Sequence, residues 1–406
     1  MKDASSQTAP DAQLLRLRNV MARVLKVSAE ELEKSVRTAT ADDMRAVALM
    51  RVGDGATEQA IAEDSDYLHW RYLQCPIPGT HMVVVDLKNG PVAAIGVETA
   101  QFRAKVKDQS EAFARLMDAV VAPEHQSHGL GAWLTLEVLN RFSTVIVIGS
   151  NEQSRSISEK LFTRLEIQRL YKSVLESKTV VERRLGRNLL SYAVSELVDW
   201  WNRKRIHRQT NQLPPQYTIA HFQTIDRLLS ALPDDLSGYS LGPTDCWEPL
   251  RTPSYLAWRF GSHPGRRFSA VAILDSSDHV QAYAVYTVNS SGGDRAGQDA
   301  YIVDWRSKNI AEGEDNPLSY AITGALSTLS RQRVSVVTAL VSDAESAHSF
   351  QQAGFVLRAH DPRFYLRTQP TNASTVSSKG FAITYADTDR IDYATSVCGE
   401  TNGRAR

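Results

Sequence analysis

The fold class that the sequence predicts is α/β, with two tandem domains of one kind and an N-terminal helical extension. A strand, a glycine loop and a helix follow one another directly over residues 116–139. A Tyr-Leu-x-Trp-Arg-aromatic motif occurs twice, at Trp70 and Trp258, 188 residues apart. Similar strand patterns follow both copies, and a repeat of this length is a duplicated domain rather than a solenoid unit. We therefore expect two domains, each with a mixed, mostly antiparallel sheet flanked by helices.

The composition is that of an ordinary globular protein of two or three domains. The chain has 406 residues, of which 42% are hydrophobic and 23% charged. Lys+Arg 46 and Asp+Glu 46 balance to a net charge of +0, so no overall field recruits nucleic acid or a membrane. Neither is expected as a partner. A local basic cluster over 183–208 is interpreted as a solvated linker face.

Cysteine usage and hydropathy predict a cytoplasmic protein. The three cysteines, Cys75, Cys246 and Cys398, form no C-x-x-C pair, so neither a disulfide framework nor a zinc cluster is indicated. Residues 1–10 are polar and contain no apolar signal core. The sequence contains no run of 18 apolar residues that would cross a bilayer.

The elements of residues 1–178 follow from apolar periodicity and turn residues. Residues 1–35 predict a helical extension, with a capping box of Ser28 and Glu31, that packs on the first domain or forms a homodimer. The first domain is placed at 36–178. Its expected strands are an initial strand, a hairpin turning at Lys88–Pro91, a central strand and a parallel strand, at 35–39, 81–87, 92–101, 116–121 and 144–149.

The second half repeats this order. Residues 179–212 predict a helical basic linker containing the pair Trp200–Trp201, which would serve packing or an interface. The second domain is placed at 213–368 and a tail at 369–406. Its expected strands are 268–274, 280–288, 301–305 and 334–341.

The glycine loop is suited to an anion. Gly129 and Gly131 lack a Cβ, and the helix that follows presents free N–H groups at its N-terminus. The pattern Gln126-x-x-Gly129-x-Gly131 resembles the pyrophosphate-binding signature of the GNAT superfamily of acyl-CoA N-acyltransferases. A dinucleotide loop fits less well, because Leu134 stands where a third glycine is needed. The alternative is a turn that uses glycine for its shape alone.

The resemblance covers roughly residues 36–368 as two GNAT-like domains, and it implies acetyl-CoA as co-substrate. Main-chain groups near Val120 and Val121 would face the pantetheine arm, which Asn151 would also bind unless it is a helix N-cap. Backbone N–H groups would hold the pyrophosphate at Gln126, Ser127, His128, Gly129, Leu130, Gly131 and Ala132. After Trp305 the second copy lacks this pattern and carries three acids within 306–317, so it is expected not to hold coenzyme A.

In the GNAT family an amine attacks the thioester directly. Glu98 and Asp118 interrupt apolar strands and are the candidate general bases, since a buried acid is costly unless paired; the alternative is that each faces outward. The tyrosine that usually protonates the leaving thiolate is replaced by Phe162. Tyr171 is close in sequence but receives no role.

A pair of histidines and a pair of tryptophans each have a functional and a structural interpretation. His125 and His128 lie three residues apart without a third ligand, so no metal is expected. Trp70 and Trp258 recur in both copies, which favours a role in the core over stacking on a sugar.

The sequence therefore predicts an N-acetyltransferase acting on the primary amine of a small metabolite or amino sugar. The missing tyrosine leaves open a non-catalytic acyl-CoA-binding regulatory protein. A Fem-type aminoacyl transferase, also built from two GNAT-like domains, is the third possibility, and the neutral net charge speaks against its RNA substrate.

Overall fold

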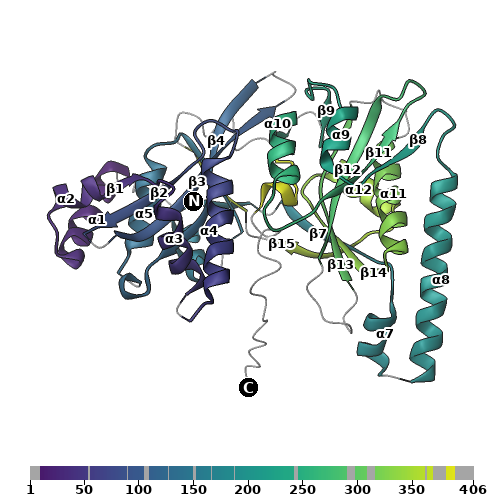
Figure 1. Cartoon of the computed structure of the whole chain (residues 1–406), viewed down its shortest axis with the longest axis horizontal. Coiled ribbons are helices and arrows are strands. Elements are labelled where there is room, and N and C mark those ends of the chain that lie inside the picture. Colours follow the sequence, from purple (N-terminus) through teal and green to yellow (C-terminus); the bar gives the residue numbers. More distant parts are fainter. Residues whose placement is uncertain are drawn as a thin grey trace, which may run out of the picture. The chain divides into compact units, whose positions relative to one another are not determined.

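A computed structural model of the chain divides into two compact units (Figure 1). Unit 1 contains residues 1–102, 110–165 and 363–378, and unit 2 contains 103–109, 166–362 and 379–406. The structure describes residues 10–53, 55–88, 90–104, 109–126, 128–149, 152–165, 167–186, 188–241, 246–289, 298–308, 316–361, 364–368 and 381–388. No helix among these residues is long and apolar enough to cross a membrane.

Unit 1 is a mixed sheet with helices on both faces. Its strands run in the order β1-β2-β3-β4-β5-β16-β6, and the pair β4–β5 is parallel. The elements are α1 (Pro10–Leu25), α2 (Ala29–Ser35), β1 (Val36–Thr38), α3 (Asp43–Val52), α4 (Glu58–Leu73), β2 (His81–Leu87), β3 (Gly90–Ala104), β4 (Gln109–Val121), η2 (Pro123–His125), α5 (Leu130–Leu139), β5 (Thr144–Ile148), α6 (Glu152–Leu161), β6 (Thr163–Leu165) and β16 (Phe364–Thr368).

Residue alternation along β3 assigns the two faces of this sheet. Val97 and Ile95 lie in one apolar core with Met21 of α1 and Trp133 of α5. Gly96 faces the other way, and a Cβ there would stand 1.8 Å from the Tyr72 hydroxyl of α4. Glycine at this position therefore lets the phenol lie directly on the strand.

Unit 2 repeats the architecture, with strand order β15-β7-β14-β13-β12-β11-β8 and a parallel pair β13–β14. The elements are β7 (Gln168–Val174), α7 (Lys178–Leu185), α8 (Leu189–Asn211), β8 (Thr218–Phe222), α9 (Ile225–Ala231), β9 (Tyr239–Ser240), β10 (Trp247–Pro249), α10 (Pro253–Leu256), η3 (Ala257–Gly261), β11 (Ser269–Leu274), β12 (Val280–Asn289), β13 (Gln298–Lys308), α11 (Pro317–Arg331), β14 (Val334–Val341), α12 (Ala344–Gln352), β15 (Val356–Asp361) and η4 (Tyr385–Asp387).

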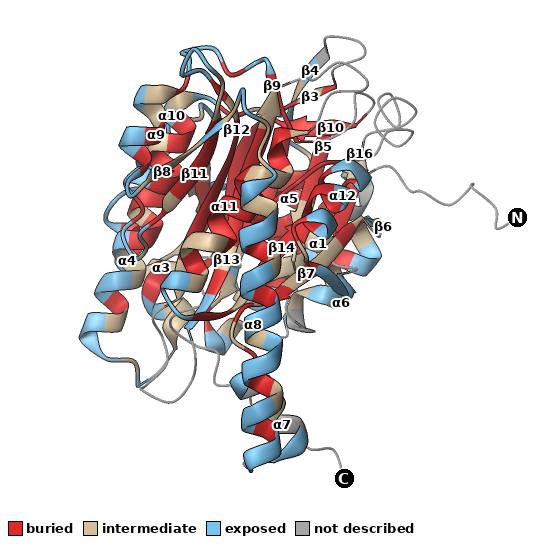
Figure 2. Ribbon diagram, turned by 90° about the vertical axis from the view of Figure 1, so that its right-hand side faces the viewer, coloured by how far each residue is buried: buried red, intermediate tan, exposed pale blue. Residues whose placement is uncertain are grey.

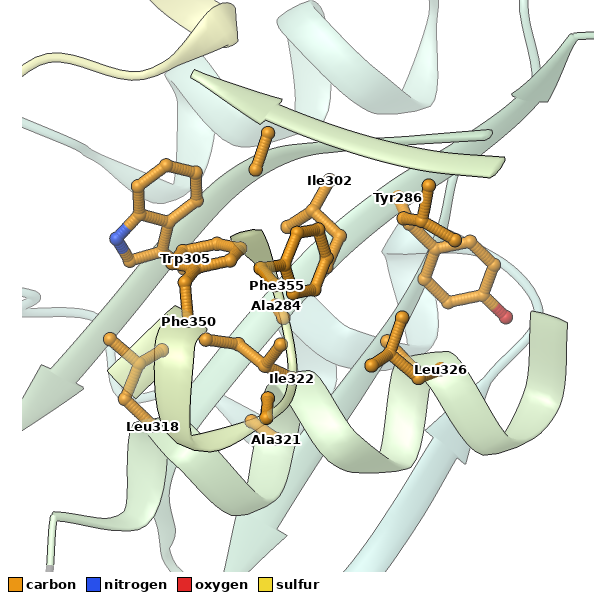
Figure 3. Packing of buried hydrophobic residues seen from close by; sticks show 14 of the residues in the cluster. Ala284, Tyr286, Ile302, Trp305, Leu318, Ala321, Ile322, Leu326, Phe350 and Phe355 are labelled. Carbon is orange, nitrogen blue, oxygen red and sulfur yellow. The ribbon is translucent and has the colours of Figure 1, made fainter. Parts of the chain in front are cut away.

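An aromatic cluster forms the centre of the unit 2 core (Figure 3). Phe350 packs against Trp305 with ring centroids 4.7 Å apart and against Phe355 at 4.9 Å. The indole N–H of Trp305 donates to the Ser346 hydroxyl at 3.0 Å, which satisfies its one polar atom. Phe350 is thus a core residue.

The two sheets exchange a strand. β16, from the second half of the sequence, lies between β5 and β6 in the first sheet. β7, from the first half, lies between β14 and β15 in the second. The domain ranges drawn from the sequence, 36–178 and 213–368, therefore do not coincide with the compact units. Apolar alternation identifies a strand but not the strand that it pairs with.

Several local expectations are confirmed. Ser28 and Glu31 form the capping box, β2 and β3 form the hairpin, and β5 is parallel to β4. Trp70 and Trp258 are both buried, in agreement with a core role.

Candidate functional site

The glycine loop connects the end of β4 to the start of α5. After Val121 the chain makes one 3-10 turn, η2, and Gln126 folds back so that its Nε2 donates to the Val121 carbonyl at 3.1 Å. Gly129 precedes α5 with φ at +84°, a left-handed conformation that residues with a Cβ adopt at a cost. The first glycine of the motif therefore sets the backbone geometry of the loop.

The N-terminus of α5 presents its amides without a side-chain cap from any described residue. Trp133 N–H is the first amide bonded within the helix, to the Gly129 carbonyl at 3.0 Å. The amides of Leu130, Gly131 and Ala132 therefore have no partner from the helix itself. Gln126, His128 and Gly129 are exposed, Gly131 and Ala132 are half-buried, and Leu130 is buried. An anion would therefore reach this positive helix end from the side of the loop.

Gly131 brings the end of β4 and α6 to the start of α5. A Cβ at this position would lie 3.5 Å from Val121 Cγ2 and 4.0 Å from Ile157 Cδ1, which are ordinary contact distances. β4 pairs with β5 only from Ala114 to Leu116 and then continues to Val121. Val120 and Val121 are half-buried on this extension. Ser127 and Asn151, also predicted site residues, lie outside the described residues.

Glu98 lies in a buried ion triad. The Arg71 guanidinium donates to one carboxylate oxygen at 2.9 Å, and Arg115 donates to the other. All three residues are buried, and the Arg71 guanidinium also donates to the Tyr67 hydroxyl at 3.1 Å. A carboxylate enclosed by two guanidinium groups is stabilised as the anion and is a weak base. The geometry therefore favours a structural role for Glu98.

Asp118 occupies a distorted position on β4. Its φ is +52°, although it lies within a strand. Arg115 and Asp118 are three residues apart and would face opposite sides of a regular strand. Both nevertheless interact on the side of the sheet that α4 covers: Arg115 through Glu98, and Asp118 through Tyr72. The left-handed residue thus turns the Asp118 side chain into the protein, while the residue as a whole stays partly exposed.

Three residues hold or neighbour the Asp118 carboxylate. The Tyr72 hydroxyl donates to it at 2.5 Å, and Arg51 Nη1 lies 3.0 Å from its Oδ1. Arg51 Nε lies 3.0 Å from Asp64 Oδ2. Burial raises the pKa of Asp64 to about 6, against the attraction of Arg51 and with the repulsion of Asp118. Burial, and then the Asp118 charge, also raise the pKa of Tyr72 well above its usual value.

Tyr72, Arg51 and Asp64 were not predicted from the sequence. One signal was available for Tyr72. The repeated motif ends in Tyr72 in the first copy and in Phe260 in the second, so the hydroxyl is the polar atom that only the first copy keeps. Phe260 packs edge to face on Phe268 at 5.1 Å.

The other candidate residues from the sequence are on other elements. Tyr171 is on β7 and belongs to the core of unit 2, whereas Phe162 packs in the core of unit 1. His125 ends η2 and His128 lies in the exposed loop. No group of three potential metal ligands occurs in the part of the chain that the structure describes.

The second unit differs at the place that corresponds to the glycine loop. α11 begins with Pro317, which has no N–H, and the Asn316 side chain accepts from Leu318 N at 3.0 Å. These two features remove donors that α5 leaves available. The three acids expected before this helix lie outside the described residues.

No protein-family model matches the sequence, and no curated protein matches it. A GCN5-related N-acetyltransferase from Anabaena variabilis ATCC 29413 is similar in structure, with a TM-score of 0.50 and 12% identity over 82% of this chain and 72% of that one. The Saccharomyces cerevisiae N-myristoyltransferase with bound myristoyl-CoA covers 86% of this chain and 89% of its own at TM-score 0.46 and 11% identity.

A probable N-acyltransferase from Enterococcus faecalis V583 gives a TM-score of 0.47 at 8% identity, covering 82% of this chain and 71% of that one. Identities this low concern the fold alone. The two mixed sheets with their parallel central pairs agree with the fold predicted from the sequence. The chain therefore has the fold of the GCN5-related N-acetyltransferases.

Proposed function

We propose that the protein is an acyl-CoA-dependent N-acyltransferase whose first unit binds the co-substrate, acetyl-CoA being the expected donor. One observation carries the proposal: the N-terminus of α5, which no described side chain caps and which begins at a left-handed Gly129 in the exposed loop after the central strand. An oriented set of free amides at a helix end is suited to a pyrophosphate. The shared fold supports this assignment.

The acceptor that we propose is a primary amine of a small metabolite or amino sugar. Its nitrogen attacks the thioester carbon and forms the C–N bond while the C–S bond breaks. The proton that the nitrogen loses ends on the leaving sulfur, so the products are an amide and free coenzyme A. Asp118 is a positioning residue in this scheme, because its carboxylate is buried and engaged by Tyr72 and Arg51. These interactions fix the left-handed backbone at Asp118, two residues before Val120. Val120 and Val121 are the residues that would face the pantetheine arm.

A single unit would bind the acyl-CoA. The capped start of α11 and its proline favour a second unit that has lost the anion site. We propose that the second half of the chain serves the fold of the first unit, whose sheet it completes with β16.

A non-catalytic acyl-CoA-binding regulator is the second candidate. Phe162, in place of the tyrosine expected from the GNAT resemblance, favours it, because the apolar side chain supplies no proton to the thiolate. Both candidates require acyl-CoA at the glycine loop, and they differ only in turnover.

A thermal-shift titration with acetyl-CoA tests binding. Ligand at about 100 times its Kd should stabilise the wild type by roughly 2.7 kcal/mol. Gly131→Glu should lose this shift, because it adds bulk and a negative charge at the anion site while its Cβ makes only ordinary contacts. Gly238→Glu, at a glycine with open space around it, is the matched control.

No shift in the wild type would refute acetyl-CoA binding. If the shift is present and Gly131→Glu retains it, the ligand binds elsewhere. Thiol release with a panel of amines then separates a transferase from a regulator that binds without turnover.

A further inference from the structure

Helix α8 has an inverted polarity. The positions that it buries against the body of unit 2 include the small polar residues Ser191, Ser195 and Asn202. Ile206 is also buried, but most of the large apolar side chains of the helix point outward, among them Leu190, Leu197 and Trp201, which are 63%, 65% and 60% exposed. Figure 2 shows exposed residues along most of this helix. A surface helix that only covers a core has the opposite arrangement.

The outward residues form one continuous stripe. Leu190, Leu197 and Trp201 follow at intervals of seven and four residues, which place them on the same side of a helix. Trp200 is next to them and 51% exposed. These four residues are called the α8 apolar stripe. It extends over about 17 Å, at 1.5 Å per residue.

Polar contacts hold α8 in this orientation. Asn202 Nδ2 donates to the Val174 carbonyl of β7 at 2.9 Å, and Arg205 Nη1 donates to the Gly354 carbonyl after α12 at 3.3 Å. Nearer the N-terminus of the helix, the Ser177 hydroxyl donates to the Ser195 carbonyl at 3.2 Å. These contacts, from Ser195 to Arg205, fix the helix in the orientation in which the stripe faces outward.

Positive charge continues the stripe. Lys204 and Arg208 follow Leu197 and Trp201 at helical spacing and are exposed, and Lys204 Nζ lies 4.9 Å from the centroid of the Trp200 ring. The segment 178–211 contains eight Lys and Arg against three Asp and Glu, a net +5 in a chain of net +0. The segment 178–211 is therefore strongly basic although the chain as a whole is neutral.

We propose that the α8 apolar stripe and its basic continuation form a docking surface for an anionic phospholipid bilayer. Leucine and tryptophan are suited to the boundary between headgroups and acyl chains, and the adjacent lysine and arginine attract acidic headgroups. A second copy of the chain fits less well, because pairing this helix with itself would bring two net +5 segments together. A nucleic acid would leave the leucines without apolar partners.

This association is peripheral. α8 is held by its polar face in unit 2, so its outward face alone is available to the bilayer, with the helix axis along the membrane surface. An enzyme or binding protein attached in this way would act on molecules at or near that surface. The inference depends only on α8 and does not require the proposed transferase activity.

Vesicle flotation of the full chain tests the proposal. We expect the wild type to float with phosphatidylcholine vesicles that contain phosphatidylserine, and about tenfold less with phosphatidylcholine alone or at high salt. Leu197→Glu/Trp201→Glu and Lys204→Glu/Arg208→Glu should each lower binding to acidic vesicles about tenfold or more. Leu49→Glu, at a 51% exposed leucine of α3, is the matched control and should bind like the wild type.

Fluorescence quenching by brominated lipid provides a second measurement on the same surface. Trp200 and Trp201 are the tryptophans placed to reach the bilayer, so Trp200→Phe/Trp201→Phe should float normally but lose the quenching. Equal flotation of the wild type and both glutamate double variants would refute the proposal. Absent flotation, together with a dimer in sedimentation velocity that Leu197→Glu/Trp201→Glu dissociates, would assign the stripe to a second copy instead.

Discussion

At the scale of single residues, the two glycines of the loop have different physical roles. Gly129 needs its φ of +84°, whereas Gly131 lies in α5 with room for a Cβ. Gly129→Ala should therefore lower the free energy of unfolding by about 1 kcal/mol. Gly131→Ala should be neutral or raise it by up to about 1 kcal/mol, because alanine favours the helix. Urea denaturation of both variants measures the difference.

Equal destabilisation by the two alanines would contradict this assignment and would place Gly131 under a constraint that its contacts do not show. The same denaturation series should include the wild type with saturating acetyl-CoA, so that stability and binding are compared on one scale.

The raised pKa of Asp64 predicts a pH dependence of stability. Burial raises this pKa from 3.8 to about 6, so the contribution of Asp64 is complete below about pH 4 and is lost as the pH rises through 6. The shift of about two units corresponds to on the order of 3 kcal/mol at neutral pH. Asp64→Asn should remove this loss, and its stability relative to the wild type should therefore rise between about pH 4 and pH 7.5. Denaturant unfolding of both proteins at both pH values gives the difference in their free energies of unfolding and the change of this difference with pH. A constant offset between the two proteins would show that Asp64 titrates as in the unfolded chain.

The sequence identified the residues of the site better than it identified their environments. Glu98 and Asp118 were recognisable because an acid within an apolar strand needs a partner. Their partners come from α3, α4 and β4, up to 67 residues away in the case of Arg51 and Asp118. Such pairings depend on how the helices pack on the sheet, and the apolar periodicity of the sequence does not specify this packing. Aspartate adopts the left-handed conformation more readily than most residues, but few aspartates do so, and the residue type alone therefore did not predict the conformation of Asp118.

At the scale of elements, a buried ion cluster attaches the segment 381–388 to β13. Arg251 Nη2 donates to Asp304 at 3.0 Å and to Asp387 at 2.9 Å, and the Thr384 hydroxyl donates to Asp304 at 3.0 Å. The two carboxylates raise the pKa of Arg251 against the effect of its burial. Arg251→Met would leave both acids buried without their cation and should destabilise unit 2 by about 3–5 kcal/mol.

Arg155→Met is the matched control for this prediction, because Arg155 forms an exposed pair with Glu159 of the same helix. It should cost less than 1 kcal/mol. Chemical denaturation of both variants checks the contrast, and similar losses would mean that the buried cluster contributes no more than a surface pair.

The helical linker shows why element boundaries are less predictable than elements. The sequence predicted a helical linker over 179–212 without a break, and the structure has two helices there, α7 and α8. Gly186, with φ at +75°, ends the first, and Asn188 caps the second by accepting from Ser191 N at 2.8 Å. Both residues were visible in the sequence, but the apolar pattern continues across them.

At the scale of the whole molecule, the strand exchange makes the first sheet depend on a distant segment. Leu366 of β16 pairs with Ile146 of β5 and Thr163 of β6. Leu366→Pro should therefore speed amide hydrogen exchange in β5 and β6, because proline removes a donor from the middle of the sheet. Val356→Pro, on the edge strand β15, should affect β7 and leave β5 protected. Exchange measured by mass spectrometry on both variants separates the two effects. Unchanged exchange in β5 after Leu366→Pro would contradict the pairing.

The architecture itself was predictable, and the exchange was not. The strands that the sequence predicted lie within a few residues of their expected places, apart from the earlier start of β4 at Gln109, because alternation and turn residues are local signals. The exchanged strands, β7 and β16, were not among those predicted. Which of two similar sheets accepts β7 or β16 depends on contacts between segments about 200 residues apart. Two sheets of similar strand order offer similar partners for a strand, and the apolar pattern of the strand carries no preference between them.

The exchange also affects how the protein is made. β6 is complete when residue 165 has been synthesised, but β16 ends at Thr368, so a ribosome that adds about 5–20 residues per second leaves β5 without its neighbour for roughly 10–40 s. During that time the nascent chain exposes an open strand edge, which is a template for pairing with other chains. Faithful synthesis of this protein therefore depends on protecting that edge, and slow translation of the second half should increase aggregation more than slow translation of the first.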